Sequence, residues 1–181
     1  RRPVEAIRPG DMVLTKDNGP QAVLWCRSGP QSLDGMERHR RPVLIKAGAL
    51  GPNLPNKDLI VSPQHRILVG EAGQLTSVFP HDAFATAKGL TGWPGIRHMM
   101  GRRDVIWVHV VCARHEVVRA NGCWSESLLL GRMAQRSLTP SERIDLRAVL
   151  PTPTDPNFLN GLPARPCLLP EATRRAIREA R

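Results

Sequence analysis

Short apolar segments, separated by glycine, proline and asparagine, recur from the start of the chain to about residue 128. This spacing is typical of an all-β domain. It predicts a hairpin with strands at 12–16 and 21–27 around a turn at 17–19, followed by strands at 43–47, 59–62 and 65–69. Two further strands are expected to join near residues 113–114. A turn at Asn121-Gly122 then leads to a last strand that ends near residue 128.

The pattern changes after Gly131. A helix is predicted from Pro140 onward, because Thr139 can cap its first turn together with Glu142. Its apolar side would be formed by Ile144, Leu146, Val149 and Leu150. Residues 151–170 hold six prolines, which excludes a regular element there, and a short helix should follow from residue 170 or 171 to the end. We therefore expect a β domain at 1–131 and a helical, extended tail at 132–181.

The stretch LIVSPQHRILVG, residues 59–70, places polar side chains between two apolar runs. Pro63 holds Ser62 extended, so Ser62 and His65 bracket a tight bend and can point toward one spot. In a strand at 65–69, His65 shares a face with Ile67 and Val69 and is partly desolvated. Two interpretations remain open on these residues alone: a structural histidine with a hydrogen-bond partner, or a catalytic one.

Three segments, in the same order along the chain, carry a resemblance to a known family. They are VSPQHRILV around His65, the opening run PVEAIRPGDMVLTKDNGP, and the late run VIWVHVVCARHEVVRANGCWSES. Together they resemble Hint domains, the self-processing modules of hedgehog C-terminal regions and inteins, with Ser62 where that family usually has Thr. The run AGALGPNLPNKDLIVSPQHRILV is most similar to the bacterial branch. The resemblance covers residues 3 to about 128 and implies a horseshoe of short, mostly antiparallel strands.

The resemblance also implies a reaction. In Hint domains a Cys or Ser at the first position attacks the preceding carbonyl, which converts a peptide bond into a thioester or ester. The leaving amide nitrogen needs a proton donor, and His65 matches that role, with Ser62 supporting the amide through its hydroxyl. His115 matches the family's late histidine, and His109 lies near a position where many inteins carry an Asp. Core packing is an equally open interpretation of His115 and the favoured one of His109.

Three departures from the family pattern limit the reaction. No residue of this sequence matches the first-position nucleophile, because Cys26 comes too late and in an apolar setting; we expect the nucleophile upstream of Arg1, in a longer protein. Asn121-Gly122-Cys123 mimics a splice junction, but Asn-Gly between two strands is better explained as a tight turn. Cleavage or acyl transfer is thus expected rather than splicing. No residue matches sterol activation.

Two acidic residues near the resembling segments have simpler interpretations. Asp11 in the run RPGDMV is interpreted as a turn residue, since Gly-Asp commonly precedes a strand. Glu126 follows a strand and is interpreted as a solvated charge.

Composition changes this picture little. The formal net charge of +10 suggests an acidic partner, but the charge is scattered apart from residues 38–41 and the terminal helix. With no Tyr and three Phe, there is little on which bases could stack, so nucleic acid is not the expected partner. The expected substrate is the chain's own precursor, with an unknown acyl acceptor. The alternative is an inactive Hint scaffold that serves as an interaction domain.

The four cysteines show no zinc-ligand spacing, so neither a metal nor a cofactor is expected. Cys26 and Cys112 lie in apolar runs and are interpreted as small core residues. No apolar run is long enough to span a membrane. The compartment is left open, with a secreted bacterial host protein as one option.

Overall fold

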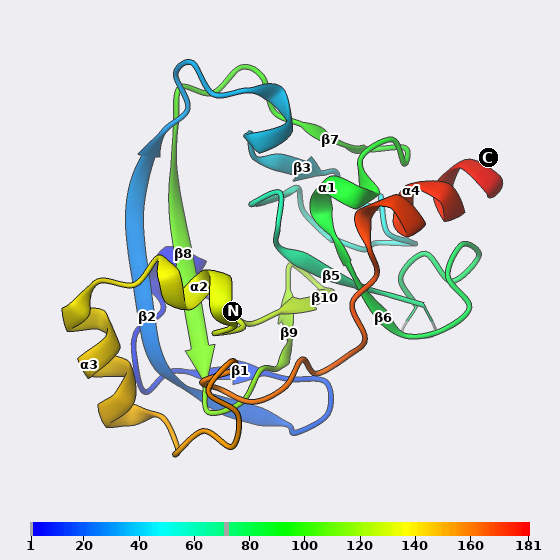
Figure 1. Ribbon diagram of the computed structural model, residues 1–181. Coiled ribbons are helices and arrows are strands. Elements are labelled where there is room, and N and C mark those ends of the chain that lie inside the picture. The colour runs from blue at the N-terminus through cyan, green and yellow to red at the C-terminus, as the bar shows by residue number, and fades with distance from the viewer. Residues whose placement is uncertain (1, 71–72) are drawn as a thin grey trace. The chain divides into compact units, whose positions relative to one another are not determined.

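The structure is a computed structural model that describes residues 2–70 and 73–181. Within these residues the strands form three sheets, shown in Figure 1. One sheet has the order β1 (Met12–Leu14), β2 (Pro20–Ser32), β8 (Asp104–Cys112). The second has the order β6 (Ala83–Thr86), β5 (Arg66–Val69), β10 (Cys123–Glu126), β9 (Val117–Ala120). The third has the order β4 (Leu59–Val61), β3 (Val43–Ile45), β7 (Ile96–His98). The expected all-β class is confirmed, and the strand pairs whose register is resolved are antiparallel.

The chain divides into two compact units, and several segments contribute to each. The first unit comprises Arg1–Gly29, Ile106–Val118 and Ser127–Ala164; the second comprises Pro30–Val105, Arg119–Glu126 and Arg165–Arg181. The tail after residue 131 therefore contributes to both units. A domain boundary at residue 131 stays a prediction.

The first unit is built on the β1–β2 hairpin and two helices of the tail. Met12 pairs with Ala22 across the hairpin, as the turn at 17–19 predicts. The helices are α2 (Arg132–Arg136) and α3 (Pro140–Val149). The core of this unit contains Val111, Leu130, Leu138 and Leu146.

The predicted helix is confirmed as α3, including its cap. The Thr139 hydroxyl accepts from the Glu142 amide, and the Glu142 carboxylate accepts from the Thr139 amide. Its expected apolar side is wrong in part. Leu146 is fully buried, but the side chains of Ile144 and Val149 are exposed, because the helix contacts the core along a narrow stripe.

The second unit holds the larger core, to which β3, β5 and β6 contribute buried aliphatic side chains. Gly70 ends β5 at a φ of +110°, and a Cβ there would clash with the His81 carbonyl. The predicted terminal helix is confirmed as α4 (Pro170–Glu179), which packs against α1 (Ala87–Leu90) in Figure 1. Gly89 of α1 lies against Thr173, and Ile177 enters the core.

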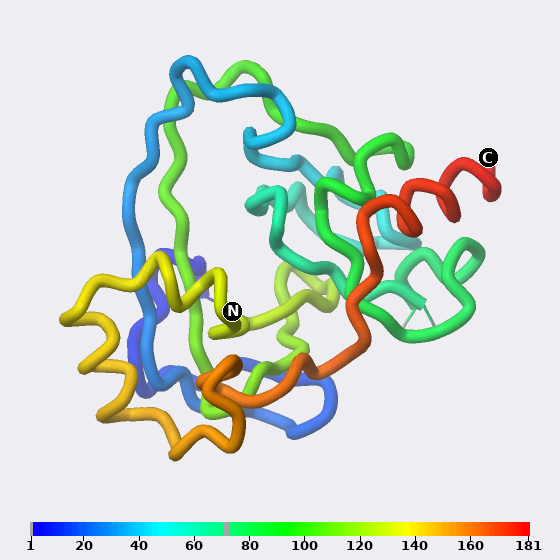
Figure 2. Tube along the Cα trace, in the orientation of Figure 1, coloured from blue at the N-terminus to red at the C-terminus, as the bar shows by residue number. Residues whose placement is uncertain are grey.

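The remaining predictions differ in detail. Residues 150–169 follow an irregular path between α3 and α4, as their prolines predict (Figure 2). β2 extends to Ser32, five residues beyond the predicted end, and the sequence reasoning missed β6, β7, α1 and α2. These elements are only three to five residues long, too short for a periodic pattern to reveal. Among the described residues, no helix has the length and apolar composition needed to cross a membrane.

Candidate functional site

Ser62 and His65 lie together in the second unit, on the bend between β4 and β5. The His65 amide donates to both the hydroxyl and the carbonyl oxygen of Ser62, each at 3.1 Å. The Ala87 amide donates to the His65 carbonyl at 2.8 Å, and the Lys88 amide donates to the Pro63 carbonyl at 3.0 Å. The first residues of α1 thus hold the bend from the other side.

The predicted strand at 65–69 begins one residue later, so His65 precedes β5. Its side chain is half-buried, whereas Ile67 and Val69 are fully buried. The bend, rather than the strand face, therefore sets the environment of His65, and it keeps the imidazole partly accessible.

Next to this bend, Glu126 corrects the sequence interpretation. Glu126 is not solvated: its side chain is 8% exposed and forms an ion pair with Arg66, with 2.8 Å between Oε2 and Nη1. Its other carboxylate oxygen accepts from the Arg66 backbone amide at 2.8 Å. Burial opposes the charge on Arg66, but the attraction of Glu126 outweighs it and raises the Arg66 pKa. Glu126 therefore fixes the residue that directly follows His65.

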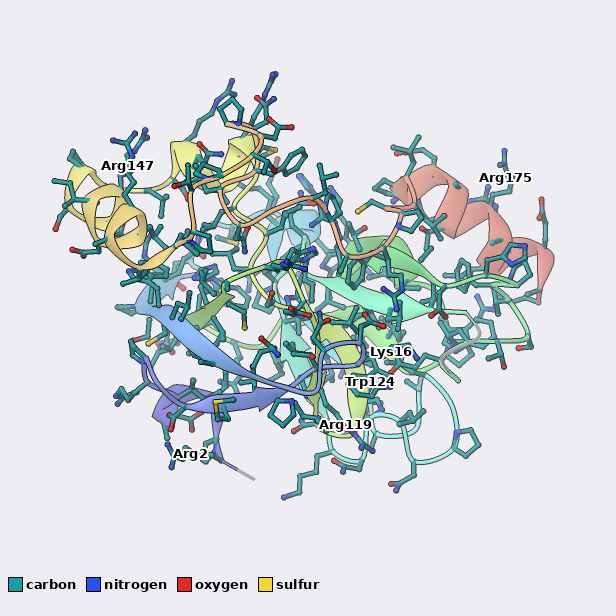
Figure 3. The ribbon with its side chains drawn as sticks, turned by 90° about the horizontal axis from the view of Figure 1, so that it is seen from below. Arg2, Lys16, Arg119, Trp124, Arg147 and Arg175 are labelled. Atoms are coloured by element: carbon teal, nitrogen blue, oxygen red, sulfur yellow. The ribbon has the colours of Figure 1, made fainter. Side chains whose placement is uncertain are left out.

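The β9–β10 hairpin carries Glu126 to this place. Ser125 of β10 pairs with Ile67 of β5, which aligns the end of β10 with the start of β5. Arg119 and Trp124 brace the hairpin, with the guanidinium 5.6 Å from the ring centroid (Figure 3). The only sequence signal for Glu126 was its place at the end of a strand that follows an Asn-Gly turn.

That turn also bears on the splice-junction alternative. Asn121 and Gly122 have φ values of +48° and +85°, as a tight hairpin turn requires. The Asn121 carbonyl accepts from the Asn56 amide at 2.7 Å, and its side-chain amide donates to the Asp58 carbonyl at 3.2 Å. These contacts give Asn121 a structural role.

His115 lies in the first unit and is buried, with 3% of its surface exposed. Its backbone amide donates to the Asn160 carbonyl at 2.8 Å, and its Nδ1 accepts from the Ala164 amide at 3.1 Å. Because a backbone amide can only donate, Nδ1 carries no proton, and the neutral ring holds its proton on Nε2. The tail thus sets the tautomer of His115.

The neighbour of His115, Glu116, is a buried residue that the sequence reasoning did not single out. Its carboxylate accepts from the Asn18 side-chain amide at 2.9 and 3.1 Å, and its backbone amide donates to the Ser127 hydroxyl at 2.9 Å. It joins the turn of the β1–β2 hairpin to the His115 segment. The only signal in the sequence was the position of Glu116 directly after a candidate histidine.

His109 lies on β8 in the first unit, where its charge contributes to the lowered pKa of Glu142. The larger cause of that lowering is the Thr139 amide, which donates to the carboxylate. His109 therefore lies near the N-terminal end of α3. The role of His109, structural or catalytic, stays a prediction.

Asp11 caps the turn that precedes β1. Its carboxylate accepts from the Arg8 amide at 2.8 Å and pairs with Arg2 at 2.5 Å. The Arg8 amide, with a further contribution from Arg2, holds the Asp11 pKa below its ordinary value. The carboxylate is thus engaged in the turn, in line with the sequence interpretation.

The cysteines are poorly suited to be nucleophiles. Burial raises the pKa of both the Cys112 and the Cys123 thiols to about 11. Only ~10⁻⁴ of such a thiol is ionised at neutral pH. Cys26 is half-buried, with Sγ 3.6 Å from the Ile7 carbonyl, while burial raises the pKa of the more exposed Cys167. In the part of the chain that the structure describes, no three His, Cys, Asp or Glu side chains group as a metal site requires.

Comparison with known proteins identifies one family. A sequence model of the Hint domain matches residues 1–132. The crystal structure of the MchDnaB-1 intein is similar to this chain at 15% identity and a TM-score of 0.32, over 68% of this chain and 88% of that one. No curated protein sequence matches the chain.

Proposed function

Since the chain belongs to the Hint domain family, we propose that it is the self-processing domain of a longer precursor and acts on a peptide bond of its own polypeptide. Hint domains as a family are autoprocessing modules.

The first step is an acyl shift at a Cys or Ser upstream of Arg1. The thiol or hydroxyl attacks the carbonyl carbon of the residue before it, so that a C–S or C–O bond forms and the C–N bond breaks. The nucleophile gives up its proton, and the leaving nitrogen takes one to become an amine. The high pKa values of Cys112 and Cys123 support an upstream nucleophile.

His65 supplies the proton to the leaving nitrogen, and this assignment rests on the bend. The bend fixes the His65 backbone through Ser62 and Ala87, Glu126 fixes the next residue, Arg66, and His65 itself is half-buried. A fixed backbone and a partly desolvated ring are what a general acid needs. Ser62 accepts from the His65 amide at its oxygen, and its hydroxyl proton supports the scissile amide as a donor.

His115 assists the shift or the release step as a second donor. Its Nδ1 accepts from Ala164, so any proton that His115 donates in the reaction comes from Nε2. His109 has the lesser role, because its neighbour Glu142 already gives it a structural one.

Release follows by attack of water or another nucleophile on the thioester or ester. Cleavage or acyl transfer is favoured over splicing, because Asn121 is held in a tight turn by Asn56 and Asp58.

The test uses a precursor that extends upstream of Arg1 to the first Hint position. Mass spectrometry should find a break immediately before the nucleophile. His65→Ala should slow the cleavage ~10²- to 10⁴-fold. His81→Ala, an exposed histidine of the same unit, should cleave like the parent. Equal rates for His65→Ala and the parent would remove His65 from the reaction. A parent that stays intact would favour the inactive scaffold.

A further inference from the structure

The second unit contains a cationic pocket that the proposed reaction does not use. Its volume is about 390 Å³. Four of the residues that line it are basic or can become so: Arg38, His39, Arg97 and His98. The lining residues also include Ile96, which is 3% exposed, and none of them is acidic.

Strand pairing brings the two basic segments of this pocket together. Val43 of β3 pairs with His98 of β7, so the short 3₁₀ helix η2 (Arg38–Arg40), just before β3, lies near β7. The Met99 amide also donates to the Pro42 carbonyl at 2.8 Å. The pocket is therefore assembled by the sheet, although its basic residues come from runs more than fifty positions apart in the sequence.

Arg41 holds the backbone next to the pocket, and its guanidinium is used for these backbone contacts. Its guanidinium donates to four backbone carbonyls, those of Leu33, Met36, Met100 and Arg102. The carbonyl of Arg41 accepts from His98 Nδ1 at 3.1 Å. Because a carbonyl can only accept, Nδ1 of His98 holds a proton, and Nε2 could donate to an oxyanion only in a ring that carries a second proton.

The charge of the pocket is only weakly compensated. His39 lies 3.5 Å from Glu37, but both side chains are more than 70% exposed. A contact of this kind contributes little. Arg38 and Arg97 offer the planar forks of donors that guanidinium groups present, which match the oxygens of a phosphate group.

We infer that this pocket binds a phosphate-type oxyanion carried by a small molecule, with Arg38 and Arg97 as its main contacts. The volume is in the range of small-molecule sites and exceeds that of a single phosphate group, so it leaves room for what the phosphate is attached to. The lining residues include no Phe, Tyr or Trp, the larger side chains on which bases stack, which disfavours a nucleic-acid strand.

Calorimetric titration of the chain with inorganic pyrophosphate at low ionic strength tests this inference. We expect binding with one site per chain. Arg38→Gln and Arg97→Gln should each weaken it about tenfold or more, since each change removes a charged hydrogen-bond donor. Arg97→Lys should recover only part of the loss, because an ammonium lacks the fork.

The matched control is Arg175→Gln, an exposed arginine on α4 of the same unit, labelled in Figure 3. It removes the same charge outside the pocket and should bind pyrophosphate like the parent. The inference is overturned if the parent does not bind pyrophosphate, or if Arg175→Gln loses as much affinity as Arg97→Gln. Binding of single-stranded DNA with steep salt dependence, in the absence of pyrophosphate binding, would overturn it as well.

Discussion

The segments around His65 and His115 are held in contrasting ways. His65 lies half-buried on a bend whose hydrogen-bond partners, Ser62 and Ala87, are 3 and 22 residues away. His115 is almost fully buried, and its partners, Asn160 and Ala164, come 45 and 49 residues later in the chain.

The difference shows that the two histidines depend on different parts of the chain. The surroundings of His65 come from residues inside the Hint match at 1–132, whereas those of His115 include tail residues beyond it. Asn160 is central to the tail's contribution, because its side chain also accepts from the Leu130 amide and donates to the Leu128 carbonyl. We therefore expect changes in the core of the first unit, to which the tail contributes Leu138 and Leu146, to affect His115 and leave His65 unchanged.

The largest effect should come from Leu146→Ala. Leu146 is fully buried in the core of the first unit, so its truncation leaves a cavity and should cost about 3 kcal/mol. Hydrogen exchange should accelerate at the His115 amide, which donates to Asn160, and stay unchanged at the Ala87 amide, which donates to His65.

Ile144→Ala is the control on the same helix. Ile144 is 67% exposed, so the free energy of unfolding should change by less than about 0.5 kcal/mol. Equal acceleration at the His115 and Ala87 amides in Leu146→Ala would show that both units open together, and the contrast between them would not hold.

Glu126→Gln should produce the opposite pattern. The change removes the charge that pairs with Arg66 but keeps an amide of similar shape, and should cost about 2 kcal/mol. Exchange should accelerate at the Arg66 amide and stay unchanged at the His115 amide. Glu171→Gln breaks a comparable but exposed ion pair with Arg174 and should cost less than about 0.5 kcal/mol. A similar cost for both variants would mean that Glu126 does not fix the bend.

The same contrast explains what the sequence could and could not predict. The Thr139 cap and the Asn121-Gly122 turn depend on residues within a few positions of each other, so local patterns predicted both. The contact between Glu126 and Arg66 spans 60 residues and follows from strand register, which no local pattern contains. For the same reason, the sequence offered no way to connect His115 with Ala164.

Helical periodicity failed for another reason. It correctly predicted an apolar side for α3, but it did not predict how much of that side the rest of the unit buries. Leu146 contacts the core, whereas Ile144 and Val149 lie where no other part of the described chain buries them. The width of the buried stripe depends on the partner surface, and the helix sequence alone does not contain it.

The smallest effect should come from Glu142→Gln, through the pH dependence of stability. The Thr139 amide, which donates to the carboxylate, holds the Glu142 pKa below its ordinary value of 4.5, and Arg27, with its Nε 3.2 Å away, adds to the lowering. A pKa lowered in the folded state means that the carboxylate stabilises the fold above the ordinary pKa. This contribution is lost as the pH falls through the lowered value.

Urea unfolding of the parent and of Glu142→Gln should therefore differ by about 0.5 kcal/mol at neutral pH, with the parent more stable. The gap should begin to close as the pH falls below 4.5 and should vanish below the lowered pKa of the folded state, where the parent's carboxyl is neutral too. A gap that stays constant with pH would mean that the shape of Glu142, and not its charge, supports the cap. Because α3 belongs to the first unit, hydrogen exchange at the Ala87 amide of the second unit should be the same in both proteins, at neutral pH and below pH 4.5.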